Sequence, residues 1–153
     1  MTRYASKTGV PIERSRAEIE RILQRYAATA FMYGSKADRA VVGFEIAGRH
    51  IRMILPMPTS DDKLIAYDGR GHKRTDHELD VAIQKEARRR WRALSLVIKA
   101  KLEAVASGIA ILEDEFLAYT VLPDGRTVGE WARPQIQATY DKGKMPPLLG
   151  MGE

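Results

Sequence analysis

The feature that most constrains this chain is one long amphipathic segment in its second half. From residue 79 to 105 apolar side chains recur every three or four positions, which is the spacing of one face of an α-helix. Thr75 followed by Glu78 forms a capping box, and Gly108 is a typical stop. We therefore predict one uninterrupted helix over residues 76 to about 107, roughly 45 Å long. Its apolar stripe consists of Leu79, Ile83, Ala87, Trp91, Leu94, Ile98, Leu102 and Val105.

The segment before this helix has the two-residue period of β-strands. Residues 39–46 and 50–57 are rich in β-forming side chains and are joined by Ala47-Gly48, a short hairpin connection. In the second run apolar residues alternate with His50 and Arg52, so one face is apolar and the other is basic. Residues 31–33 are a candidate third strand. We expect the long helix to pack on the 39–57 hairpin through Leu79, Ile83, Trp91, Leu94 and Ile98.

A first helix is predicted over residues 16 to about 29, because Ser15 and Glu18 repeat the capping pattern and apolar residues follow at helical spacing. The outer face of this helix carries Arg14, Arg21 and Arg25.

The C-terminal part shows further helical patterns. Apolar residues at helical spacing favour a helix within 109–119. A last helix begins near Thr127, with Gly143 as its C-cap, and Pro134 predicts a kink or a delayed start. We expect its inward face to comprise Val128, Trp131, Ile136 and Tyr140.

These elements predict one α+β domain over residues 1–153. It has an N-terminal helix, a short antiparallel β-hairpin or three-stranded meander, a long amphipathic helix and C-terminal helices. The ends, residues 1–11 and 144–153, are expected to be loosely ordered tails. The polar segment 59–74 reads as a surface loop, a place where function is often found.

Composition narrows the function classes. The chain has no cysteine, which excludes a disulfide framework, a thiolate zinc site and a cysteine nucleophile. It shows no signal-peptide pattern and no apolar run near the ~20 residues that cross a bilayer, so we expect a cytoplasmic protein without membrane contact. The net charge of +5 favours an anionic partner.

This charge is concentrated around the long helix. Residues 73–101 hold nine Lys or Arg against four acids, an excess equal to the net charge of the whole chain. A basic ridge lies opposite the apolar stripe, and Lys73 and Arg74 precede it. Such a ridge could neutralise phosphates, and the alternative is an ordinary solvated helix face. The ridge consists of Lys85, Arg88, Arg89, Arg92 and Lys99.

The hairpin and the loop add candidate contacts for nucleic acid. Arg49, His50 and Arg52 could track a backbone, and Tyr67 could stack on a base. Tyr33 is a further candidate platform. Phe44 and Trp91 are expected in the core.

No catalytic or metal-binding pattern is evident, so we expect a non-enzyme without a metal or another cofactor. The histidines His50, His72 and His77, even with Asp76 or Asp80, lack zinc-site spacing. Acidic clusters at 61–62 and 113–115 suggest a nuclease, but the Glu-x-Lys pattern is missing after Glu45.

Five stretches together resemble a family of small, uncharacterised proteins encoded in bacteriophages and prophages. They are AEIERILQRYAATAF, GFEIAGRHIRMILP, RRRWRALSLVIKAKLEAV, LPDGRTVGEW and MPPLL. The resemblance implies a phage gene product in a bacterial host cytoplasm and transfers no catalytic residue. Small basic phage proteins commonly serve DNA replication, recombination or packaging, or inhibit a host protein.

Three functions remain open at this point. The first is a non-enzymatic nucleic-acid-binding protein, with single-stranded DNA favoured and a role in replication or recombination. The second is a protein that binds and inhibits a host protein through its basic helix. The third is an enzyme acting on nucleic acid. Self-association is also possible, because the long apolar stripe exceeds what one small sheet covers.

Overall fold

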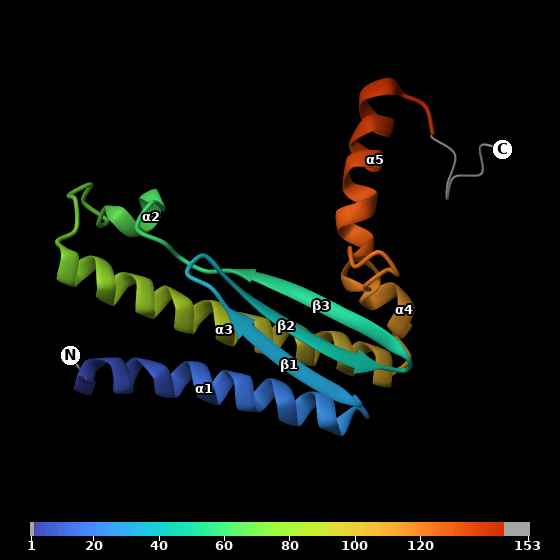
Figure 1. Cartoon of the computed structure of the whole chain (residues 1–153), viewed down its shortest axis with the longest axis horizontal. Coiled ribbons are helices and arrows are strands. Elements are labelled where there is room, and N and C mark those ends of the chain that lie inside the picture. Colours follow the sequence, from blue (N-terminus) through green and yellow to red (C-terminus); the bar gives the residue numbers. More distant parts are fainter. Residues whose placement is uncertain (1, 146–153) are drawn as a thin grey trace.

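A three-stranded antiparallel sheet, in the order β1-β2-β3, lies at the centre of the structure (Figure 1). The computed structural model describes residues 2–145, with side chains from residue 12 onward. Two long helices on one side of the sheet, together with shorter helices, complete an α+β fold, as predicted. The elements in chain order are α1 (Thr2–Arg25), β1 (Ala30–Ser35), β2 (Arg39–Ile46), β3 (Arg49–Pro56), α2 (Lys63–Ala66), α3 (Asp76–Ala106), α4 (Leu112–Glu115), the 3-10 helix η1 (Leu117–Tyr119) and α5 (Val128–Lys142).

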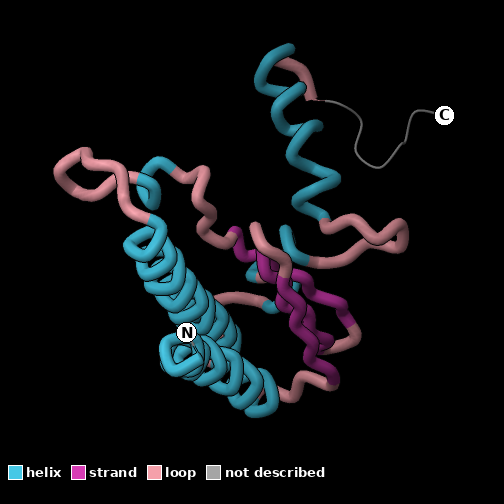
Figure 2. The backbone as a smooth tube through the Cα atoms, turned by 60° about the vertical axis from the view of Figure 1, so that its left-hand side comes forward, coloured by secondary structure: helices cyan, strands magenta, loops and turns pink. Residues whose placement is uncertain are grey.

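Helices α1 and α3 lie side by side on one face of the sheet (Figure 2). Side chains alternate along β2, so that Val42 and Phe44 are buried against the helices while Val41 and Gly43 point to the other face. Phe44 meets Phe116 edge to face at 5.7 Å between ring centroids, as expected for a core aromatic. The sheet therefore separates a helix-covered face from an open face.

The β2–β3 hairpin confirms the prediction to within one residue at each end. Its two-residue turn has positive φ at both Ala47 (49°) and Gly48 (75°), the backbone that matches the twist of the flanking strands. The candidate third strand is present as β1, longer than its predicted three residues.

Helix α3 is uninterrupted, as predicted, and both halves of its capping box form. Thr75 accepts a hydrogen bond from the backbone N–H of Glu78, and the Glu78 carboxylate accepts one from the backbone N–H of Thr75. Its packing differs from the prediction, because α1 is its main neighbour and Leu79 and Ile83 stay partly exposed. The helix is longer than the sheet, so its N-terminal half extends beyond the strands.

Loss of this cap should be measurable. Thr75→Ala removes the side-chain acceptor at the start of α3, and we expect a fall of about 0.5–2 kcal/mol in the free energy of unfolding. Thr75→Asn, which keeps an N-cap acceptor, should recover most of it. Urea unfolding followed by circular dichroism measures both; equal losses for the two variants would contradict a capping role.

The predicted start of the first helix is wrong. Helix α1 begins at Thr2, and Ser15 lies 5% exposed inside it rather than at its N-cap. The apolar stripe continues through Ile12, seven residues before Ile19, so tertiary burial extends the helix past the local cap signal. The helix also ends earlier than expected, at Arg25, because Ala27 adopts a left-handed φ of 65° and turns the chain toward β1.

The C-terminal region corrects two further predictions. Residues 109–119 form only the short α4 and η1. Phe116 separates the two helices, because its backbone is not helical (φ −111°, ψ 17°) and its side chain is buried in the core, 1% exposed. Helix α5 starts at Val128 and continues through Pro134, with Gly143 as its left-handed C-cap. It projects away from the sheet (Figure 1), and its expected inward residues Ile136 and Tyr140 are 54% and 82% exposed.

The end of the predicted C-terminal tail, residues 146–153, lies outside the described residues. Within the part of the chain that is described, no helix is both long enough and apolar enough to cross a membrane.

Candidate functional site

The predicted basic ridge on α3 divides into two groups in the structure. Arg89 donates from Nε to Oε2 of Glu86 at 2.8 Å, so it belongs to an ion pair. Neighbouring Arg90 bonds Glu86 at 3.0 Å and the carbonyl oxygen of Pro56 at 2.8 Å, which ties α3 to β3. Arg90 therefore connects two elements of the fold, whereas Arg89 pairs within α3. The other four members of the ridge have no such contacts among the described residues.

This ion pair predicts a pH dependence. Hydrogen bonds from Arg89 and then Arg90 lower the pKa of Glu86 from 4.5 to about 2. A lowered pKa in the folded state stabilises above the unfolded pKa, and the stabilisation is lost as pH falls toward the folded pKa. Glu86→Gln should cost on the order of 1 kcal/mol near neutral pH, since Arg89 is exposed and screened.

The difference in unfolding free energy between the two proteins should shrink as pH falls from about 4.5 to about 2. Urea unfolding of both proteins at about pH 7 and about pH 3 measures it. A difference that does not change with pH would show that the ionised carboxylate of Glu86 contributes nothing.

The contacts of α3 define its two flanks. On one flank Arg90 reaches β3, and Lys101 donates to the carbonyl oxygen of Glu115, the last residue of α4, at 3.2 Å. At 100° per residue the remaining ridge residues lie on the opposite flank, which borders α1. These residues are Lys85, Arg88, Arg92 and Lys99.

Helix α1 supplies a second set of cations beside them. Its Glu20 and Gln24 line a hollow with residues 28–31 at the start of β1, so this flank of α1 lies next to the sheet. The opposite flank therefore borders α3, and three exposed arginines lie on it. They are Arg14, Arg21 and Arg25, spaced by seven and four residues.

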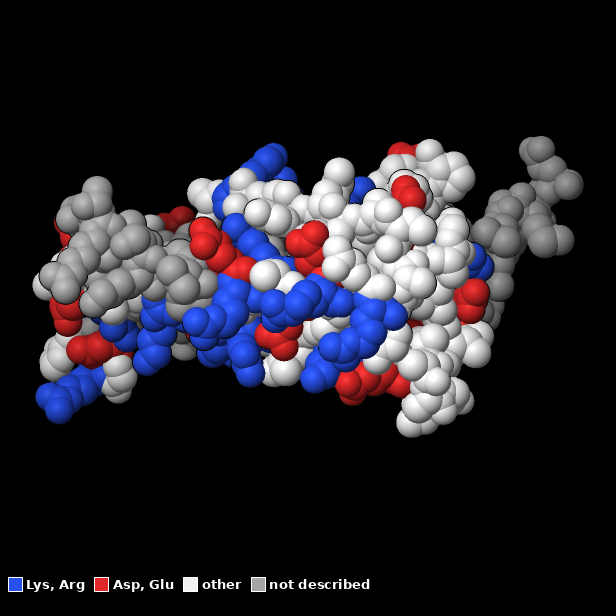
Figure 3. Space-filling view, turned by 90° about the horizontal axis from the view of Figure 1, so that it is seen from below, with Lys and Arg blue, Asp and Glu red and all other residues white. Residues whose placement is uncertain are grey.

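Together these flanks form one surface, which we call the two-helix basic face. It comprises Arg14, Arg21 and Arg25 of α1 and Lys85, Arg88, Arg92 and Lys99 of α3. Figure 3, seen from the side of the helices, shows Lys and Arg gathered in a band across the middle of this side, with few acids between them. Among the side chains described, none of the seven takes part in an ion pair. Their charge is therefore available to a partner.

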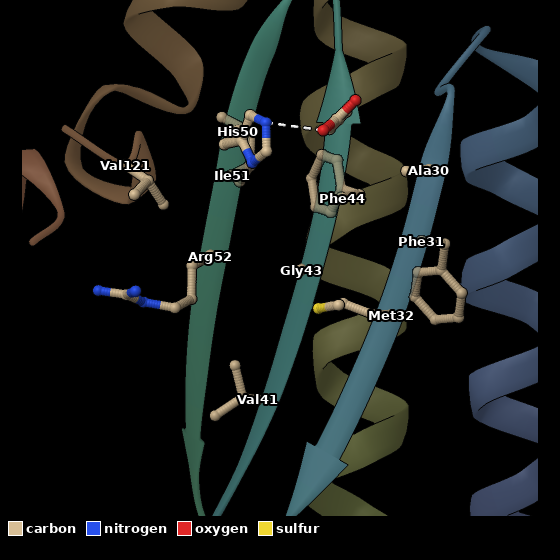
Figure 4. Close-up of a pocket in the computed structure, with 11 residues that line it drawn as sticks. Ala30, Phe31, Met32, Val41, Gly43, Phe44, His50, Ile51, Arg52 and Val121 are labelled. Carbon is tan, nitrogen blue, oxygen red and sulfur yellow. Dashed lines mark ion pairs between the residues drawn. The ribbon is translucent and has the colours of Figure 1, made fainter. Parts of the chain in front are cut away.

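The hairpin residues predicted for the same site lie elsewhere. His50 and Arg52 point to the open face of the sheet, with the sheet between them and the helices (Figure 4). Arg52 bonds the carbonyl of Gly125 at 2.8 Å and Glu130 at 3.3 Å, which anchors the base of α5. The structure therefore does not join the hairpin to the basic ridge.

The remaining candidates either pair with an acidic side chain, as His50 and Arg49 do, or lie in the loop away from the two-helix basic face. His50 lies 2.7 Å from Glu45, and Arg49 is 3.7 Å from Glu113. Tyr67 is half-exposed in a bridge with Lys73, beyond the N-terminus of α3, and Arg74 directly follows this bridge.

The aromatic platforms are not part of the basic face either. The Tyr33 ring is half-exposed, but the Arg16 guanidinium covers it at 4.3 Å from the ring centroid. The same guanidinium lies 4.7 Å from the ring of Trp91, which is buried as predicted. Arg16 thus links α1, α3 and β1 by cation–π contacts.

An open hollow lies on the uncovered face of the sheet (Figure 4). Gly43 forms its floor, because it has no side chain to fill the space, and Met32 of β1 and Arg52 of β3 line it from either side. In the described range no group of three or more His, Cys, Asp or Glu could hold a metal ion.

In comparisons with family models, curated proteins and solved structures, nothing matches this chain.

Proposed function

We propose that this protein is a non-enzymatic nucleic-acid-binding protein that contacts the phosphate backbone through the two-helix basic face. The observation that carries the proposal is the convergence of seven cations from two helices without an ion-pair partner among the described residues. Cations held in this way gain more from a polyanion than ion-paired ones, because no internal pair has to be broken.

The dimensions of the face suit a strand of nucleic acid. From Lys85 to Lys99 the helix axis rises about 21 Å, and the α1 arginines run beside it. A backbone lying along this line would pass several phosphates, since duplex DNA carries one charge per ~1.7 Å of its axis. Several simultaneous contacts are therefore geometrically possible.

The positions of the predicted stacking rings bear on the form of nucleic acid, because Arg16 covers Tyr33 and Tyr67 lies beyond the N-terminus of α3. Single-strand binders combine a basic track with rings that stack on bases. The sequence favoured single-stranded DNA because a hairpin with Arg49, His50 and Arg52 beside a basic helix suits backbone tracking with stacking on bases. With both of these rings off the face, we propose sequence-independent backbone contacts, which duplex and single-stranded nucleic acid can both make.

The biological setting is a second part of the proposal. The sequence resemblance suggests a phage protein that acts in replication or recombination in a bacterial cytoplasm. Binding to the backbone regardless of sequence would suit such a role.

A salt titration tests the function. We expect wild-type protein to bind both a single-stranded and a duplex oligonucleotide, with affinity falling by about two orders of magnitude between about 50 and 200 mM salt. This corresponds to four or five phosphate contacts, at a slope of about −0.7 each for single strands and about −0.9 each for duplex. Fluorescence anisotropy measures it. No binding at low salt would overturn the proposal and leave an acidic protein surface as the partner of this face.

A further inference from the structure

A pocket lies between α2 and the N-terminal half of α3, at the Lys85 end of the two-helix basic face. Three cations line it, Arg74, Lys85 and Arg89, together with the carboxylate of Glu86. Arg89 and Arg90 both bond this carboxylate, so its charge is already compensated. The charges of Arg74 and Lys85 remain for a ligand.

Arg74, which directly precedes the N-cap of α3, is the first of the two pocket cations left for a ligand. Its Nε is shielded from solvent and has no hydrogen-bond partner among the described residues. The Glu78 carboxylate accepts a hydrogen bond from the backbone N–H of Thr75, so it belongs to the helix cap. Its pKa is lowered chiefly by its hydrogen bonds with Thr75 and less by Arg74. Because the Nε of Arg74 is shielded, an anion in the pocket would bond the terminal nitrogens of the guanidinium, as a charge-assisted contact.

The other wall of the pocket is apolar. Leu64 of α2 lines it and is 87% exposed, and Val81 of α3 contributes from the opposite side. An exposed leucine beside unpaired cations suits a ligand that joins a phosphate to a group with a flat apolar surface. A nucleotide has this chemistry.

We infer that this pocket binds the terminal phosphate of a nucleic-acid strand whose backbone follows the two-helix basic face. The inference rests on the proposed function, and Lys85 belongs to both sites. A terminal phosphate carries nearly two charges at neutral pH, whereas an internal diester carries one. Arg74 and Lys85 would therefore prefer a strand end, with Leu64 and Val81 against the terminal nucleoside.

The test compares short oligonucleotides with a 5′-phosphate, a 3′-phosphate or hydroxyl groups at both ends. We expect one phosphorylated form to bind wild-type protein about tenfold more tightly than the hydroxyl form, the effect of one or two charge-assisted hydrogen bonds. Arg74→Gln should reduce this ratio to about one. Lys73→Gln, which removes the same charge from the exposed neighbouring residue, should leave the ratio unchanged.

The outcomes separate the two proposals. If wild-type protein binds the phosphorylated and hydroxyl forms equally, the pocket proposal is overturned while backbone binding stands. If no oligonucleotide binds, the proposed function fails. The pocket is then tested separately, with inorganic phosphate alone. Phosphate should then raise the melting temperature of wild-type and Lys73→Gln protein above that in chloride of equal ionic strength. A rise of the same size in Arg74→Gln, or no rise in wild type, would refute the pocket.

Discussion

Replacing Arg88, Arg92 and Lys99 together by Gln should make the slope of log affinity against log salt shallower by about two units for single strands. Each residue lies on the flank of α3 that borders α1 and has no ion-pair partner among the described side chains. Near 50 mM salt we expect the affinity to fall by roughly two orders of magnitude. Gln keeps helix propensity, so the unfolding free energy should hardly change.

The matching variant on α1 tests what the tertiary structure adds. We expect a similar loss of oligonucleotide affinity when Gln replaces Arg14, Arg21 and Arg25, because the structure places these arginines beside the α3 cations. A control variant replaces Lys36, Arg70 and Lys142 by Gln; these three exposed cations lie outside the face. Its slope of log affinity against log salt should equal that of wild type, apart from the small effect of net charge.

The pattern of loss identifies the surface. If only the α3 variant weakens, the partner contacts one helix rather than the two-helix basic face. If all three variants weaken equally, the attraction depends on net charge alone. If none weakens while oligonucleotide still binds, the site lies on the hairpin side, where Arg52 and His50 point.

Leu94→Ala should lower the free energy of unfolding by about 2–5 kcal/mol. Leu94 is 7% exposed and belongs to the core between α3, α1 and the sheet. Removing its branched end leaves a cavity as well as losing apolar burial, which is why the expected cost exceeds that of most single substitutions. Chemical denaturation measures the difference.

Leu96 provides a matched control two residues later on the same helix. It is 49% exposed, so Leu96→Ala should cost less than about 1 kcal/mol while changing the same residue type in the same helix. Equal losses at the two positions would mean that α3 is rotated relative to the arrangement described above.

Local patterns were sufficient for the elements with strong signals. The two ends of α3 follow from the Thr75 box and Gly108, and the hairpin follows from its two-residue period and the Ala47-Gly48 turn. These signals depend only on residues close together in the sequence. The structure confirms the elements that they predict, because no tertiary contact opposes them. The same reasoning placed the start of α1 wrongly, since burial of Ser15 and Ile12 outweighed a local cap.

The candidate site shows the same division. The sequence alone placed Lys85, Arg88, Arg92 and Lys99 on one face of a helix, because helical periodicity fixes that arrangement without reference to any other element. The regular spacing of Arg14, Arg21 and Arg25 marked a flank of α1, but periodicity within one helix cannot tell which helix lies beside it. Only the packing of α1 against α3 on one face of the sheet brought the two sets together, and the same sheet separated His50 and Arg52 from them. Which charges share a surface was decided by packing between distant segments.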